Sequence, residues 1–470
     1  MTRAFVAGLL LFAFCRTFAA EGAALVIAGA TVIHPEREAA SAVESDQTLV
    51  IVDDRIRAVG RSGSVAVPEG ARAIDARGKW VIPALTDAHV HFDQSGSLYA
   101  RPDIADLTFW QPYATEQARN RSRIEITLRA WAASGVTALI DVGGPHWTFE
   151  LRQRAKQLPW APTIAAAGPL VSMVARPQLD LGDPPIVQVK SSDEVRKVVQ
   201  DTLRYRPDFI KVWFIHQPGD DLAQQEAIVR AAGEAAHAAG VRLAVHATEL
   251  AVAKAALRAG ADYLVHSVED APIDEEFVRL ARARDVAYCP TLFVHEGYAL
   301  ALSNRWQPTP AEQRLADPQV LTMMRDLDII PREKLPAWMR RAIEQSWGGR
   351  GSDHAYANVR RVWDAGIAMV MGTDAGNIGT LHGPAVFREM ARMVQAGLTP
   401  LEVLRAATIN GARLMRRDAG AIAPGDVADL VVLDADPLQD IVNTSRTRWV
   451  VKAGRAFEVD ALRAQMEEGR

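Results

Sequence analysis

Short apolar runs rich in β-branched residues alternate with alanine-rich stretches through the middle of the chain. The apolar runs predict buried strands, and the alanine-rich stretches, such as residues 225–239 and 250–259, predict helices. A further helix is expected at residues 399–415, where Thr399-Pro400-Leu401-Glu402 supplies an N-cap, an N1 proline and a capping-box glutamate. Eight strand–helix units favour a (β/α)8 TIM barrel over an open, doubly wound sheet. The eight runs are residues 81–91, 136–142, 163–168, 209–214, 242–247, 263–267, 286–292 and 368–375.

The two ends of the chain have a different pattern from the middle. Residues 24–76 contain short β-type runs separated by turn residues such as Asp53-Asp54, and similar runs return at residues 428–433 and 449–451. Neither set alone is enough for a stable sheet. The expected fold is therefore α/β, with a small β-sandwich domain built from both chain ends (residues 21–80 and 421–460) beside a barrel at residues 81–420.

One connection in the predicted barrel is unusually long. Residues 293–360, between the seventh and eighth runs, are rich in proline and tryptophan. In a barrel this segment emerges on the catalytic face, so we expect a lid that shapes the substrate pocket. The alternative is a purely structural helical insertion.

The first twenty residues have the layout of a secretory signal peptide. Arg3 precedes the apolar residues 4–14, and small residues follow near residue 19. The apolar run is too short to span a bilayer comfortably, although an N-terminal membrane anchor is the alternative. We therefore expect a secreted or periplasmic protein without stable membrane association after signal cleavage. Cys289 then remains as the single cysteine, which excludes an intramolecular disulfide.

The net charge of −4 is small, and no basic stripe is available to neutralise phosphates. This composition argues against a nucleic-acid partner. A small-molecule substrate is expected instead, and a homo-oligomer stays open.

Histidines recur at the carboxyl ends of the predicted strands. His89 and His91 end the first run, and because alternate residues of a strand share a face, both point into the mouth of the barrel. His246, His266 and Asp374 end the fifth, sixth and eighth runs. A lone histidine on an apolar strand is usually a satisfied core residue. Four histidines and an aspartate at the same end of one barrel predict a metal site, with neutral imidazoles as ligands.

Lys211 lies within the fourth run, between Phe209 and Trp213 on the same face. A buried ammonium group without a partner is costly, and burial lowers its pKa and leaves a nucleophilic amine. Such an amine can react with CO2 to form a carbamate, an anionic ligand able to bridge two metals. The alternative is an amine paired with an acid such as Asp374.

Several motifs resemble those of the amidohydrolase superfamily, nearest its imidazolonepropionase-like and metal-dependent dipeptidase branch. The resemblance covers nearly the whole chain after the signal. Ala84 and Thr86 replace the usual glycine and a larger residue, but neither is a ligand. The opening signature is residues 81–91, the closing signature is residues 372–374, and further matches lie at residues 382–389, 396–400, 406–410 and 422–430.

The resemblance implies a binuclear centre. His89, His91 and Asp374 would bind one metal, His246 and His266 the other, and carboxylated Lys211 would bridge them. Two Zn2+ ions are expected for this donor set, with Mn2+ or Co2+ as substitutes. Metal-activated hydroxide would attack the substrate carbonyl, and Asp374 would carry the proton to the leaving amine. The expected catalytic residues are Asp374, Lys211 and His266.

Three further residues are candidate substrate contacts. Tyr288 in the seventh run would polarise the carbonyl or simply fill the barrel, His382 follows the eighth run, and His146 lies in a loop after the second.

The sequence therefore predicts an exported metal-dependent hydrolase of a carbon–nitrogen bond in an amide, N-acyl amino acid or dipeptide-like substrate. The alternatives are a lactonase, phosphotriesterase or deaminase on the same metal site, and a non-catalytic metal-binding protein.

Overall fold

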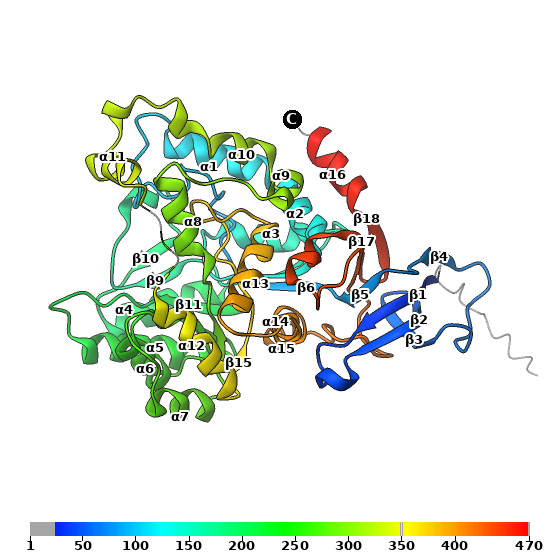
Figure 1. Ribbon diagram of the computed structural model, residues 1–470. Coiled ribbons are helices and arrows are strands. Elements are labelled where there is room, and N and C mark those ends of the chain that lie inside the picture. The colour runs from blue at the N-terminus through cyan, green and yellow to red at the C-terminus, as the bar shows by residue number, and fades with distance from the viewer. Residues whose placement is uncertain (1–23, 348, 350, 469–470) are drawn as a thin grey trace, which may run out of the picture.

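The computed structural model describes residues 24–347, 349 and 351–468. The predicted signal peptide, residues 1–20, lies outside the described residues. Two parallel sheets with surrounding helices form the larger part of the molecule, and a mixed sheet lies at one end of it (Figure 1). The predicted α/β class is confirmed.

All strands of the two central sheets run parallel. Parallel sheets buried on both faces need apolar strands, which is why these segments read as continuous apolar runs. One sheet is β6 (Leu85–Val90), β7 (Val136–Asp141) and β8 (Thr163–Ala166). The other, in spatial order, is β10 (Ile186–Gln188), β9 (Leu170–Ser172), β11 (Phe209–Trp213), β12 (Arg242–His246), β13 (Tyr263–Val265), β14 (Ala287–Cys289) and β15 (Ala368–Met369).

Each of the eight predicted runs contains a strand, but the first run is divided. Val81 and Ile82 belong to β5 (Trp80–Pro83), where they pair with Val432 and Val431 of β16 (Leu430–Leu433) in the mixed sheet. The central strand β6 begins only at Leu85. The run looked continuous because both strands are buried and apolar. β9 and β10 lie outside the predicted runs.

The mixed sheet combines strands from both ends of the chain, as the sequence pattern suggested. Its spatial order is β18-β17-β16-β5-β1-β2-β3, and β4 pairs with β1. The strands are β1 (Leu25–Ile33), β2 (Val43–Val52), β3 (Arg55–Arg61), β4 (Arg72–Asp75), β5, β16, β17 (Thr447–Lys452) and β18 (Arg455–Glu458).

Helices cover the central strands. The predicted helix at residues 250–259 is α6 (Leu250–Ala259), and the predicted capping box at Thr399 is confirmed. The helix expected at residues 399–415 is interrupted at Thr408. These helices are α1 (Tyr113–Ser122), α2 (Ile124–Ala133), α3 (Trp147–Ala155), α4 (Ser192–Leu203), α5 (Leu222–Ala238), α6, α7 (Glu275–Ala283), α12 (Asp353–Asp364), α13 (Ala385–Gln395), α14 (Pro400–Ala407), α15 (Ile409–Leu414) and α16 (Val459–Glu468).

The long connection before β15 is helical and has its own small core. Its residues pack with the loop that follows β6, through Leu98, Tyr99 and Leu107 against Trp306 and Met339. It contains α8 (Phe293–Leu302), α9 (Pro310–Leu315), α10 (Pro318–Met323) and α11 (Ala337–Glu344). Short 3-10 turns are η1 (Ala39–Ser41), η2 (Pro177–Leu179), η3 (Asp326–Asp328), η4 (Arg332–Lys334) and η5 (Ile441–Ser445). Among the described helices, none combines the length and apolar character that crossing a bilayer requires.

Candidate metal centre

The six predicted metal ligands line one cavity of about 310 Å³ at the carboxyl ends of the parallel strands. We call these six residues the cavity floor. His246 lies opposite Val265 in the pairing of β12 with β13, so His266 is one residue further along the neighbouring strand. The floor residues are His89 in β6, His91 just after it, Lys211 in β11, His246 at the end of β12, His266 just after β13 and Asp374 in the loop after β15.

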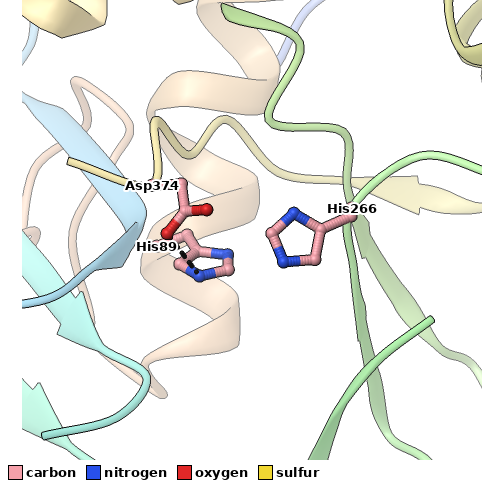
Figure 2. Close-up of side chains that lie close together, drawn as sticks. All are labelled: His89, His266 and Asp374. Carbon is pink, nitrogen blue, oxygen red and sulfur yellow. Dashed lines mark ion pairs between the residues drawn. The ribbon is translucent and has the colours of Figure 1, made fainter. Parts of the chain in front are cut away.

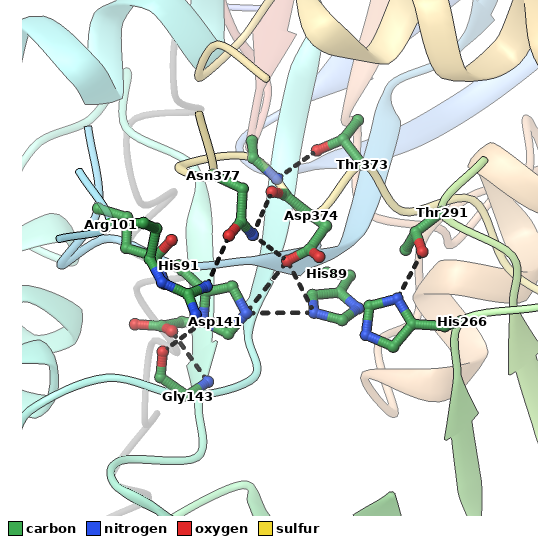
Figure 3. Close-up of polar contacts among 12 residues, drawn as sticks. His89, His91, Arg101, Asp141, Gly143, His266, Thr291, Thr373, Asp374 and Asn377 are labelled. Atoms are coloured by element: carbon green, nitrogen blue, oxygen red, sulfur yellow. Dashed lines mark hydrogen bonds and ion pairs between the residues drawn. The ribbon is translucent and has the colours of Figure 1, made fainter. Parts of the chain in front are cut away.

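Asp374 lies between the two histidines of the first strand. The Nε2 atoms of His89 and His91 are each 3.2 Å from Asp374 Oδ1, and they are 3.3 Å from one another (Figure 3). Three polar atoms therefore converge on one point of the cavity.

His266 and His246 extend this cluster. A ring nitrogen of His266, one of His89 and an oxygen of Asp374 all lie within 4.8 Å of one another (Figure 2). The ring centroid of His266 is 4.9 Å from that of His89 and 4.4 Å from that of His246. The described residues thus bring all four predicted histidines and the aspartate together.

Two of the rings are oriented by hydrogen bonds at Nδ1. His91 Nδ1 donates to the Gly143 carbonyl oxygen at 2.6 Å, and His266 Nδ1 lies 2.7 Å from Thr291 Oγ1. Because a carbonyl oxygen only accepts, His91 Nδ1 carries a proton and Nε2 faces the cavity. Metal-binding histidines are typically oriented in this way.

Burial keeps three of the histidines neutral. It lowers the pKa of His89 to about 4 and the pKa values of His246 and His266 well below their usual value. Acceptor atoms of neutral rings repel an ionised carboxylate when they are crowded around it. A positive charge between these groups removes that repulsion. The donor set therefore fits divalent metal.

Lys211 lies among these groups with 2% of its surface exposed. Burial lowers its pKa to about 7, although the charge of Asp374 opposes that shift. The Asp374 carboxylate lies against His89 and His91 instead, and the described residues provide Lys211 with no ion pair. Its amine is therefore substantially unprotonated near neutral pH.

Part of the candidate metal centre lies in strained backbone. His266 has φ of 76°, Asp374 of 60° and Thr291 of 46°, in the left-handed region that non-glycine residues rarely adopt. Such conformations persist only where the surrounding structure enforces them, as at functional sites. Here Asp374 N–H donates to the His89 carbonyl oxygen at 2.8 Å.

A glycine allows the loop that carries Asp374 to approach β6. A Cβ atom on Gly372 would lie 2.8 Å from His89 Cβ and 2.6 Å from Cys289 Sγ. Asp87, which is fully buried, also joins the two segments, because its carboxylate accepts hydrogen bonds from Thr373 N–H and Oγ1–H.

The sequence did not predict the other polar residues that line the cavity. We call four of them the cavity rim: Arg101, Glu269, His295 and Tyr298. His295 Nε2 lies 2.7 Å from Glu269 Oε1. The rim residues lie in loops or in α8, and no periodic pattern marks them. The cavity is also lined by apolar side chains, which we call the apolar wall: Leu170, Leu179, Pro185, Ile186 and Trp213.

The three candidate substrate contacts lie apart from the residues that line this cavity. Tyr288 is fully buried, and its hydroxyl donates to Ser267 Oγ and accepts from Val268 N–H. His382 lies behind the wall, with Nε2 2.7 Å from the Gln94 carbonyl oxygen. His146 pairs with Asp183 at 2.8 Å. A substrate role for these residues finds no support in their positions.

Fold and site together define a parallel-strand α/β protein with a candidate metal centre at the carboxyl ends of its strands. Residues 80–454 match the amidohydrolase family, and the chain belongs to that family. The predicted resemblance is thereby confirmed, as is the class of enzyme, a hydrolase of carbon–nitrogen bonds.

Individual relatives are distant. A dihydroorotase from Anaeromyxobacter dehalogenans is 25% identical over 443 residues, 87% of this chain and 88% of the relative. An imidazolonepropionase from Geobacillus is 36% identical over 106 residues, 21% of this chain and 24% of the relative. The solved structure of a Xaa-Pro dipeptidase with bound methionine superposes with a TM-score of 0.67 at 22% identity, covering 93% of this chain and 100% of the other. That last likeness concerns the fold alone.

Proposed function

We propose that the protein is an exported metal-dependent amidohydrolase that hydrolyses the carbon–nitrogen bond of an amide, N-acyl amino acid or dipeptide-like substrate at a binuclear centre. The observation that carries this proposal is the convergence of the six floor residues on one cavity, with the buried amine of Lys211 among them.

The parallel strands are proposed to close into one (β/α)8 barrel. Support comes from backbone hydrogen bonds between the two sheets. Ala88 N–H donates to the Met371 carbonyl oxygen at 2.9 Å on one side, and Asp208 N–H donates to the Ala166 carbonyl oxygen at 2.9 Å on the other. The barrel would span residues 81–420, with the composite β-domain at residues 21–80 and 421–460 and a lid at residues 293–360.

In the proposed centre, His89, His91 and Asp374 would hold one Zn2+, and His246 and His266 would hold the other. The unprotonated Lys211 amine would add to CO2 and lose a proton, and the resulting carbamate would be an anionic ligand shared by the centre. Bound zinc supplies Lewis acidity, which acidifies water and polarises the scissile carbonyl.

Asp374 is suited to move the proton. Burial alone would raise its pKa, but the close contacts of the carboxylate with His89 and His91 hold the pKa well below its usual value. The carboxylate is therefore ionised at neutral pH and accepts a proton from the attacking water. Donation of that proton to the leaving nitrogen completes hydrolysis. The apolar wall around Trp213 would exclude bulk water from the reacting atoms.

The proposal is tested on purified protein that begins after residue 20. Metal content is measured by elemental analysis, and turnover is assayed on N-acyl amino acids and dipeptides beside esters, lactones and phosphotriesters. About two equivalents of metal and turnover of the amide panel alone are expected. Turnover confined to the non-amide panels would refute amide hydrolysis, and one equivalent of metal would refute the binuclear centre. Fractionation of the native host tests export.

A further inference from the structure

Asn377 connects the cavity rim to the metal centre. We propose that Asn377 is a positioning residue that determines which oxygen of Asp374 faces the histidines, and that Arg101 and Tyr298 hold its amide in place. This inference rests on the proposed function, because the role of Asp374 as ligand and proton carrier gives the positioning its purpose.

The side chain of Asn377 is 3% exposed and directly contacts Asp374. Its Nδ2 donates to Asp374 Oδ1 at 2.8 Å and to the Asp374 backbone carbonyl oxygen at 3.1 Å (Figure 3). One amide group thus fixes both the side chain and the strained backbone of Asp374.

The other end of the amide is held from the cavity wall. Asn377 Oδ1 accepts from Arg101 Nη1 at 2.9 Å and from the Tyr298 hydroxyl at 2.5 Å. Both partners are donors, and Arg101 cannot accept a hydrogen bond. Their positions therefore fix the amide orientation, with the oxygen towards the rim and the N–H groups towards Asp374.

Arg101 is itself rigidly placed. Its Nε and Nη2 form a two-pronged contact with the carboxylate of Asp103, at 2.8 and 2.7 Å. Such planar pairs restrict the guanidinium strongly. The hydrogen bonds therefore run from Asp103 through Arg101 and Asn377 to Asp374.

The contact with Asn377 makes the two carboxylate oxygens of Asp374 different from one another. Oδ1 receives Asn377 Nδ2 and lies 3.2 Å from the Nε2 atoms of both His89 and His91. Within the described part of the chain, no hydrogen bond or ion pair is recorded for Oδ2. Asn377 therefore commits Oδ1 to the ligand side and leaves Oδ2 available for the transferred proton. Without the Asn377 N–H group, the Asp374 carboxylate is free to rotate, so that either oxygen can face the histidines.

The test removes the hydrogen-bond donor of the Asn377 side chain and keeps its acceptor oxygen. Asn377→Asp preserves an oxygen for Arg101 and Tyr298 but removes the N–H group that Asp374 accepts. We expect kcat to fall about 10- to 100-fold with KM within about threefold, and the metal dissociation constant to rise about tenfold or more. Asn304→Asp is the matched control, because Asn304 Nδ2 donates to Asp328 Oδ1 at 2.9 Å on the surface. It should leave all three quantities unchanged.

A second variant keeps the test informative if Asn377→Asp does not fold. Tyr298→Phe removes one hydroxyl from the amide acceptor and should lower kcat and metal affinity about threefold. Wild-type kcat and metal affinity in whichever of these variants folds would overturn the inference. A wild-type protein that turns over no amide would refute the proposed function instead, and the metal dissociation constants would still decide the role of Asn377.

Discussion

The floor and the rim of the cavity are built in different ways. The floor residues lie in, or within a few residues of, strands of the two parallel sheets, and Lys211 and His89 are almost completely buried. The rim residues Arg101, Glu269, His295 and Tyr298 lie in connecting segments, and the side chain of His295 is about half exposed at 48%. The floor is thus fixed by strand register, whereas the rim depends on the conformation of loops and of α8.

This difference suggests a division of labour. Groups fixed by strand register keep their spacing to within a fraction of an ångström, as metal coordination requires. Groups on connecting segments are free to vary without disturbing the sheets, as substrate selection requires. Floor variants should therefore change metal content and kcat. Variants of the rim pair Glu269 and His295 should change KM instead, whereas Arg101 and Tyr298 act on Asp374 through Asn377.

The largest effect is expected at Lys211. Lys211→Ala removes the amine that would form the bridging carbamate, so the protein should lose about one equivalent of metal and about 10³-fold in kcat. Elemental analysis and steady-state kinetics measure both.

Lys190→Ala, on an exposed lysine, is the control and should match the wild type. A Lys211→Ala protein with full metal content and activity would mean that the floor works without this residue. The functional difference between floor and rim would then hold only for the four floor histidines and Asp374.

A smaller effect is expected where the loop after β15 approaches β6. In Gly372→Ala the added methyl group would clash with His89 and Cys289, so we expect a loss of about 1–3 kcal/mol in the free energy of unfolding. Denaturant unfolding followed by circular dichroism measures it. Gly351→Ala, whose Cβ would meet only His295 at 3.8 Å, should change stability much less. Equal stability of the two variants would show that this approach is not tightly packed.

Much of the floor could be predicted because it follows the strand period. His89 and His91 are two residues apart on one strand face, and His246, His266 and Asp374 each follow an apolar run. The same reasoning could not separate β5 from β6, which are divided only by Ala84. The strand pattern is equally apolar on both sides, and only tertiary pairing separates them.

The rim could not be predicted, because its contacts join segments far apart in the chain. Arg101 and Tyr298 meet at the amide of Asn377, and neither residue belongs to a motif. The one local signal was proximity, since Asn377 is three residues after Asp374. His382 follows the last run and was predicted as a substrate contact. Its ring packs against Phe92 and Trp131, and only tertiary structure gives that placement.

The smallest effect is expected at the rim pair. The hydrogen bond that His295 Nε2–H donates to the Glu269 carboxylate raises the pKa of His295 against the opposing effect of burial. His295 therefore keeps its proton to a higher pH than an exposed histidine. Its ion pair with Glu269 is strongest below the raised pKa of His295. Glu269→Gln removes the negative charge, so the pKa of His295 should fall, and NMR titration of the ring protons measures the change. KM should rise by up to about fivefold, the scale of an exposed ion pair, with kcat and metal content unchanged. A fall in metal content would show that the rim supports the metal centre directly, and the distinction between floor and rim would then fail at Glu269.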